Sequence, residues 1–237
     1  MNQVAVLTLQ GAGVPKAVHP VIISDDKELV LIDCGYPGSL PLLKQAAAEQ
    51  GMELDRLTKI IITHHDYDHM GALAACKRAY PRVQVVAARE EAPYIAGEKK
   101  SLRLRQAEAL YASLPEEQKA LARGFQDRLA ALEPATVDIL VQDRDCFLWG
   151  GGIEIVATPG HMPGHISVYL KESKTLVTGD ALVAEAGRLL FANPQYTLDM
   201  KLAWQSSRKF LDYDTARIVC YHGGIVTENI RAALLAM

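Results

Sequence analysis

The residues best suited to chemistry are concentrated in one stretch, THHDYDHMG at positions 63–71. Five of six consecutive positions there are histidine or aspartate: His64, His65, Asp66, Asp68 and His69. Neutral imidazoles and carboxylates each offer a lone pair to a cation. Carboxylates that lie close together also repel one another unless a cation offsets their charge. The stretch therefore predicts a metal site.

Three later segments present the same residue types, each after an apolar run and within a turn that contains Gly or Pro. They are TPGHMPGH (158–165), VTGDAL (177–182) and YHGG (221–224). The side chains of interest in them are His161, His165, Asp180 and His222. If the strands that precede these loops end on one side of the molecule, the loops converge and complete the site.

A simpler interpretation applies to any single position. A buried histidine is commonly a hydrogen-bonded core residue, and an aspartate at a turn commonly caps it. We prefer that interpretation for His19 and His65. It does not explain why four separate loops carry the same residue types after the same kind of strand.

The elements that must position these loops are short, buried strands with helices between them. Apolar, β-branched runs bounded by Gly, Pro, Asp or Asn predict strands at 21–24, 29–35, 59–63, 83–88, 153–160, 166–170, 175–180 and 217–224. Helical patterns occupy 40–51, 71–80 and 198–211. Strands with helices interspersed predict an α/β fold in which helices cover the sheets.

Residues 89–134 break this pattern, because they are charged and helical. We interpret them as a helical insertion in a single domain that spans 1–237, and two roles remain open for it: a lid or an oligomer contact. Four of its cations could meet an anionic substrate group, although a solvated helix face is the commoner role of such a run. They are Lys99, Lys100, Arg103 and Arg105.

The ordered series H-x-D-x-D-H, TPGH, GD and a late His followed by Gly resembles the metallo-β-lactamase superfamily. That resemblance covers most of the chain, from DCG at 33–35 to HGG at 222–224. It implies a four-layer αββα sandwich with two metal ions at one edge. By position, the first ion would be held by His64, Asp66 and His161, the second by Asp68, His69 and His222, and Asp180 would bridge them. Asp33 matches the superfamily's structural aspartate, and His165 matches a position that supports the ligands from outside.

Asp66 departs from the usual signature, H-x-H-x-D-H, which has histidine at this position. Three carboxylates against two divalent ions leave one net positive charge instead of two. A less positive site acidifies a bound water less, and a harder oxygen ligand favours manganese or iron relative to the histidine version. Zinc remains the metal that the resemblance implies, and manganese or iron are open because of Asp66.

The implied activity is hydrolysis of a small ester, thioester, lactone or phosphoester by a hydroxide that bridges the two ions. Asp68 is the candidate to carry a proton to the leaving group. Tyr67 and Tyr196 are weaker candidates for lining the substrate cleft. An alternative on the same scaffold is an iron-dependent redox enzyme of the flavodiiron or dioxygenase kind.

Composition excludes several other classes of protein. The net charge of −3 with both signs interspersed does not favour a nucleic-acid or anionic-membrane partner. No apolar run approaches the ~18 residues of a membrane span. The start, MNQVAVLTLQGAG, has neither the basic residues nor the cleavage site of a signal peptide. Four cysteines without paired spacing fit a reducing compartment, so a cytoplasmic protein that acts on a small molecule is expected, with a homodimer left open.

Overall fold

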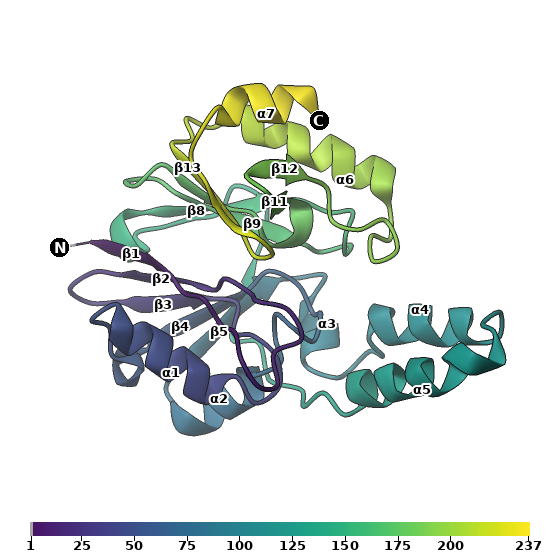
Figure 1. Cartoon of the computed structure of the whole chain (residues 1–237). Coiled ribbons are helices and arrows are strands. Elements are labelled where there is room, and N and C mark those ends of the chain that lie inside the picture. The colour runs from purple at the N-terminus through teal and green to yellow at the C-terminus, as the bar shows by residue number, and fades with distance from the viewer. Residues whose placement is uncertain (1) are drawn as a thin grey trace.

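The strands of the chain form two six-stranded sheets that face each other in a computed structural model describing residues 2–237 (Figure 1). The first sheet has the order β1-β2-β3-β4-β5-β6. Its strands are β1 (Gln3–Val6), β2 (Val21–Ser24), β3 (Leu29–Ile32), β4 (Lys59–Ile62), β5 (Gln84–Ala88) and β6 (Ile139–Val141). β3 to β6 run parallel, and β1 and β2 are antiparallel additions at one edge.

The second sheet has the order β14-β13-β10-β9-β8-β7. Its strands are β7 (Cys146–Phe147), β8 (Ile153–Ala157), β9 (Ile166–Leu170), β10 (Thr175–Val177), β13 (Arg217–Cys220) and β14 (Gly224–Val226). Only β10 and β13 pair in parallel. A separate hairpin of β11 (Val183–Glu185) and β12 (Arg188–Leu190) follows β10.

Helices cover the outer face of each sheet, which gives four layers (Figure 1). α1 (Leu40–Glu49) and α2 (Leu73–Ala79) lie on the first sheet, and α6 (Met200–Ser207) and α7 (Ile230–Ala236) lie on the second. Short 3-10 turns occupy Leu54–Arg56, Trp149–Gly151, Gly179–Ala181 and Arg208–Asp212. Among residues 2–237, no helix is both long enough and apolar enough to cross a membrane.

Three apolar clusters separate the four layers, and together they explain why the strands are so uniformly apolar. One cluster lies between α1, α2 and the first sheet and includes Leu43 and Leu73. The second lies between the sheets, where Ile61 and Val168 are completely buried. The third packs Phe210 under the helices of the second sheet. A strand buried on both faces has no polar side to alternate with, so it appears in the sequence as a continuous β-branched run.

Residues 89–134 form three helices, of which the second and third project from this body (Figure 1). They are α3 (Ala92–Ile95), α4 (Leu102–Tyr111) and α5 (Glu116–Ala130), with α4 and α5 packed against each other. Ser101 caps α4 by accepting a hydrogen bond from the backbone N–H of Leu104. The helical character predicted for this stretch is therefore present.

The loops that carry the chemically competent residues leave the sheets at one end. β3 and β4 are parallel neighbours, so Asp33 and the 63–71 loop emerge at the same edge of the first sheet. β10 and β13 are parallel neighbours in the second sheet, with Val177 opposite Val219, so Asp180 and His222 also emerge together. The loop between β8 and β9 supplies His161 and His165 beside them. The predicted convergence of the four loops follows from this topology.

Candidate metal centre

Asp33 fixes the start of the 63–71 loop from beneath. Its carboxylate accepts hydrogen bonds from the Thr63 backbone N–H at 2.9 Å and from the Thr63 hydroxyl at 2.8 Å. The same carboxylate lies 2.8 Å from Nδ1 of His69. An Nδ1–H that donates to Asp33 leaves Nε2 of His69 as the free lone pair. Asp33 holds a left-handed backbone conformation (φ 58°), which turns its side chain back under the loop.

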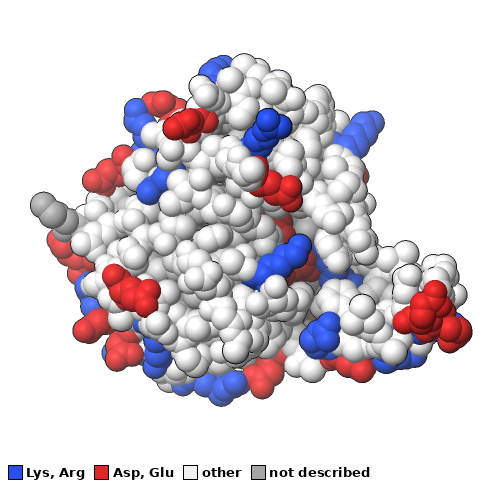
Figure 2. Space-filling view, viewed as in Figure 1, with Lys and Arg blue, Asp and Glu red and all other residues white. Residues whose placement is uncertain are grey.

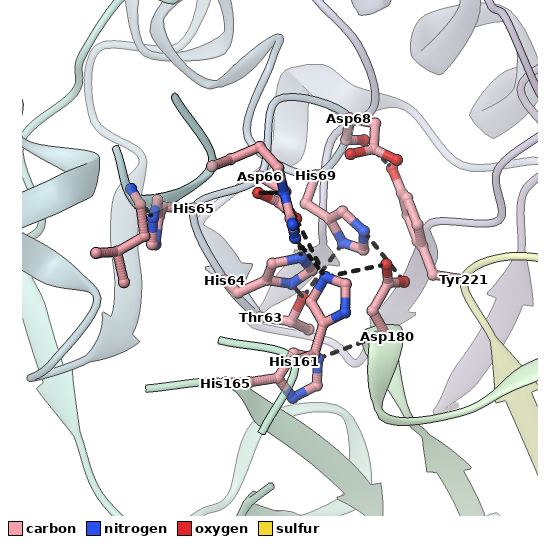
Figure 3. A network of polar contacts seen from close by, with 12 residues as sticks. Thr63, His64, His65, Asp66, Asp68, His69, His161, His165, Asp180 and Tyr221 are labelled. Atoms are coloured by element: carbon pink, nitrogen blue, oxygen red, sulfur yellow. Dashed lines mark hydrogen bonds and ion pairs between the residues drawn. The ribbon is translucent and has the colours of Figure 1, made fainter. Parts of the chain in front are cut away.

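Three ligand-type atoms meet on one side of the centre, and we call His64, Asp66 and His161 the first half-site. The Oδ2 atom of Asp66 lies 3.4 Å from Nε2 of His64 and 3.1 Å from Nε2 of His161. All three side chains are buried. Figure 3 shows the two imidazoles and the carboxylate turned toward one another although they come from loops of different sheets.

A second group meets on the other side, and we call Asp68, His69 and His222 the second half-site. Nε2 of His222 lies 3.2 Å from Oδ2 of Asp68. The carboxylate of Asp180 lies between the two half-sites, with Oδ1 at 3.3 Å from Nε2 of His69. Its Oδ2 atom is 3.5 Å from Nε2 of His222 and 3.6 Å from Nε2 of His161.

The nitrogen and oxygen atoms at this centre are better placed to bind a cation than to hydrogen-bond to one another. Nε2 of His64, Nε2 of His69 and Oδ1 of Asp180 are buried and make no acceptable hydrogen bond within residues 2–237. An unsatisfied buried polar atom costs about 1–3 kcal/mol, so three at one point call for a common partner. Imidazole nitrogens and carboxylate oxygens in groups of three are the ligands of zinc and related divalent ions.

The electrostatics of the cluster also favour positive charge. Burial alone would lower the pKa of His222, but the carboxylates of Asp180 and Asp68 outweigh it and raise the pKa to about 10. Burial would raise the pKa of Asp180, yet the neighbouring His222 and His69 hold it well below its usual range. The carboxylate of Asp180 thus retains its negative charge, which a metal ion can balance.

His165 supports Asp180 from behind. Its Nε2 atom accepts a hydrogen bond from the backbone N–H of Asp180 at 3.0 Å, and its Nδ1 atom lies 2.8 Å from the Thr158 hydroxyl. Burial lowers the pKa of His165 to about 3, so the ring is neutral and carries its proton on Nδ1. Gly179 makes room for this ring, because a Cβ atom there would lie 2.8 Å from Nε2 of His165.

An arginine from the helical insertion reaches the first half-site. Arg103, near the start of α4, has only 3% of its surface exposed. Its Nη2 atom donates to Oδ2 of Asp66 at 2.6 Å, and its Nε atom lies 3.2 Å from Oδ1 of the same carboxylate. Burial would raise the pKa of Asp66, but the charge of Arg103 and contacts with His161 and His64 hold it well below its usual range.

His65 and Glu91 connect the 63–71 loop to the same insertion. Both side chains are buried, and they form a short hydrogen-bonded pair in which Nδ1 of His65 meets Oε2 of Glu91. Nε2 of His65 accepts from the backbone N–H of Leu102, the first residue of α4, at 3.2 Å. Glu91 also accepts from the backbone N–H of Gly164 in the β8–β9 loop. This placement agrees with the preferred interpretation of His65 as a hydrogen-bonded core residue.

A cavity of about 440 Å3 opens above the two half-sites. Asp66, Asp68, His161, Asp180 and His222 lie at its base, and the remaining wall includes Lys16, Tyr36, Tyr67, Arg103, Phe125, Asn193 and Tyr196. Figure 2 shows the hollow between the body and the projecting helices, with acidic and basic side chains in it. Because Arg103 and Phe125 belong to the insertion, the insertion forms part of the cavity wall.

The structure brings together all seven residues that the sequence singles out as metal ligands. Besides the two half-sites, it groups Asp180 with His64 and His69, one residue from each half-site. That these residues bind metal remains a prediction. Tyr67 and Tyr196 lie on the cavity wall, and their contact with a substrate remains a prediction. The four cations of the insertion are not one set, because Arg103 is buried against Asp66 whereas Lys100 pairs with Glu108 at the surface and Arg105 is exposed.

Sequence reasoning did not find the supporting roles of Thr63 and Glu91, or the place of Lys16 on the cavity wall. Nothing in the local sequence distinguishes Lys16 from other surface lysines. The contact between Arg103 and Asp66 could have been anticipated in part. A carboxylate in place of a neutral histidine at position 66 calls for an additional cation nearby.

Comparison with known proteins places this geometry in a family. Residues 13–222 match the family model described as the metallo-beta-lactamase superfamily. The probable metallo-hydrolase YflN of Bacillus subtilis is 29% identical over 235 residues, which covers 89% of this chain and 81% of that protein. A hydroxyacylglutathione hydrolase of Cereibacter sphaeroides is 26% identical over 179 residues. This match covers 75% of the present chain but only 52% of the hydrolase, so the chain spans about half the length of that relative.

Solved structures show the same fold. A metallo-beta-lactamase family protein of Thermus thermophilus superposes with a TM-score of 0.78 at 19% identity, over 98% of this chain and 77% of the other. An archaeal superfamily protein of Sulfolobus tokodaii superposes with a TM-score of 0.70 at 22% identity, over 98% of this chain and 84% of the other. The predicted four-layer αββα fold is confirmed by these likenesses.

Proposed function

Because the chain belongs to the metallo-beta-lactamase superfamily and is a metallo-hydrolase of that family, we propose that it hydrolyses a small ester or thioester with two zinc ions. The observation that carries this proposal is the pair of half-sites that share Asp180, with buried donor atoms that have no other partner. The hydroxyacylglutathione hydrolases among the relatives support a thioester as the first class to test.

Ions held by these residues would polarise the carbonyl oxygen of the substrate and lower the pKa of an attacking water toward neutrality. The protein's own part is to hold the ligand atoms in place. Asp33 directs Nε2 of His69 into the centre, and His165 holds the backbone of Asp180. Both supports are buried, so water does not compete for them.

Asp68 is the residue that we propose moves a proton. Its Oδ2 atom contacts His222, and Asp68 lines the cavity where a leaving group would depart. A carboxylate has about four lone-pair sites, so one oxygen can face an ion while the other accepts a proton. Tyr67, Phe125 and Tyr196 supply an aromatic wall for the apolar part of a substrate.

Arg103 weakens the preference for manganese or iron that the extra charge of Asp66 would give. Arg103 places a positive charge directly on that carboxylate, which offsets the charge difference from the histidine version. The carboxylate oxygen of Asp66 is still a harder ligand than an imidazole nitrogen, and this favours iron or manganese. Whether the protein is a hydrolase or a redox enzyme therefore depends on which metal it retains.

The test is elemental analysis of protein purified without added metal, followed by a panel of thioesters, esters, lactones and phosphodiesters. We expect about two equivalents of zinc per chain and turnover that is lost in Asp68→Asn and in His64→Ala. Asp55→Asn is the matched control, because Asp55 is exposed in a short 3-10 turn away from both half-sites. Turnover that survives in both ligand variants would refute the assignment, and about two equivalents of iron would favour the redox alternative.

A further inference from the structure

Arg103 and Asp66 form a buried, multiply hydrogen-bonded ion pair. Three nitrogen–oxygen distances between the two groups are 3.2, 3.3 and 2.6 Å, and both side chains are nearly inaccessible to solvent. A guanidinium is always charged and presents its donors in a rigid fork that matches a carboxylate. Such a buried pair is strongly destabilised when either partner is removed alone, because the other charge is left uncompensated.

The surroundings of Arg103 hold its guanidinium at the first half-site. Nη1 donates to Oε1 of Gln106 at 2.6 Å, and the guanidinium carbon lies 5.3 Å from the centre of the Tyr196 ring. Nη2 also lies 3.2 Å from Nε2 of His161. The guanidinium therefore contacts two of the three residues of that half-site.

These contacts come from outside the two sheets. Arg103 lies on α4, whose first backbone N–H is held by His65 of the 63–71 loop. Gln106, one turn further along α4, donates at 2.9 Å to the carbonyl of Gln195, the residue before Tyr196. The start of α4 is thus held both by the 63–71 loop and by the segment that precedes Tyr196, and these contacts set the position of the guanidinium.

We infer that Asp66 and Arg103 act as one electrically neutral unit, which takes the place of the neutral histidine usual at position 66 and makes the first half-site dependent on the helical insertion. Arg103 is a positioning residue in this arrangement. The inference rests on the proposed metal-dependent function. It explains how the half-site can hold an extra carboxylate without changing its net charge.

The pair leaves room for an ion at Asp66. A carboxylate has about four lone-pair sites, so Asp66 can accept from Arg103 and still offer an electron pair to a metal. Nε2 of His161 has a single lone pair, and in this structure that atom lies within reach of Nη2. Binding of an ion at the first half-site therefore requires Nη2 to give up His161, while its contacts with Asp66 can remain.

The test compares the wild type with Asp66→His, Asp66→His/Arg103→Leu and Asp66→His/Arg105→Leu. Arg105 lies on the same helix but is exposed, so the last variant removes an equal charge away from the site. Each protein is stripped with a chelator, reloaded with zinc, dialysed and analysed for zinc per chain. The melting temperature of each stripped protein is measured as well, which reports the pair without any metal.

Asp66→His leaves the buried charge of Arg103 beside neutral imidazoles, so we expect it to retain about one ion fewer per chain than the wild type and to melt lower. Asp66→His/Arg103→Leu recreates a neutral half-site and should regain the lost ion and most of the melting temperature. Asp66→His/Arg105→Leu should behave like Asp66→His. If Asp66→His does not fold, the same rescue is read from the folded yield of the two double variants.

The failures of the two proposals are distinguishable. A wild type that retains no zinc or other metal overturns the proposed function. A wild type that retains metal, with equal metal in Asp66→His and Asp66→His/Arg103→Leu, overturns the inference about Arg103 alone. Rescue by Arg105→Leu as strong as rescue by Arg103→Leu also overturns it, since the effect would then be one of overall charge.

Discussion

Asp33→Asn tests how a buried residue outside the cavity orients the proposed metal ligand His69. The Asp33 carboxylate is 1% exposed and receives three hydrogen bonds, from the backbone N–H and hydroxyl of Thr63 and from Nδ1 of His69. An asparagine keeps one carbonyl oxygen, which can still accept from the backbone N–H of Thr63. Its amide group would then face Nδ1 of His69 with a donor.

Two donors cannot share one hydrogen bond, so the proton of His69 would move to Nε2, the atom that faces Asp180 at 3.3 Å. Replacing a group that orients a ligand costs about 10- to 100-fold in metal affinity, or about 1.4–2.7 kcal/mol. Removing a buried hydrogen bond to a charged group costs about 1.5–3 kcal/mol of stability. Both effects should therefore appear in Asp33→Asn, although the substituted side chain is not a ligand.

Metal affinity is measured by competition with a chromogenic zinc chelator, and stability by urea unfolding of the chelator-treated protein. Asp55→Asn is the matched control, since Asp55 is exposed in a short 3-10 turn away from the centre. A variant that unfolds more easily but binds zinc as the wild type does would show that Asp33 supports the loop without setting the proton on His69. A variant that is unchanged in both would refute the reasoning altogether.

Further predictions concern the acid response, the core and the turn before Asp180. Burial opposes ionisation of Asp25, but three backbone N–H donors outweigh it and lower its pKa, so its contribution is present above pH ~3.8 and lost as pH falls below that value. Asp25→Asn should therefore make the urea midpoint less sensitive to pH between about 4 and 2, and an unchanged pH profile would contradict this. Phe210→Ala, in the core under α6 and α7, should cost about 3–5 kcal/mol in urea unfolding, and a loss below 1 kcal/mol would mean that this core repacks. Gly179→Ala should lower both metal affinity and the free energy of unfolding, because its φ of +52° and the nearby His165 ring leave no space for a methyl group beside Asp180; wild-type metal retention would count against that crowding.

The parts of the fold that the sequence predicts are those buried on both faces. β2, β3 and β4 are buried at every position, so three or four consecutive apolar residues mark each of them in the sequence. The strands that escape prediction lie at edges. β11 and β12 bury only their middle residues, and β7 has only two residues, so pairing with a neighbour decides their conformation and no periodic pattern marks them.

The residues of the candidate centre could be predicted from two properties: their type, and their position just after a strand. These two properties suffice because the ends of parallel strands meet at one edge of a sheet. The partner of Asp66 could not be chosen in the same way. Arg103 lies 37 positions away, and the run EKKSLRLR offers four cations that look equivalent in sequence. Which of them turns inward depends on how α4 docks on the 63–71 loop, and that docking is a tertiary property.

Tyr221 joins parts of the centre that are far apart in the sequence, and this bears on when the centre forms during folding. Its hydroxyl donates to the Asp68 carbonyl and accepts from the Gly35 backbone N–H, over separations of 153 and 186 residues. Such contacts close very long loops, and their entropy must be lost before the contacts can contribute. We therefore expect the centre to form last, after each sheet has assembled with its own helices. An ion held across the two sheets would then act mainly on the rate of unfolding, and metal release would be the step that opens the molecule to proteases.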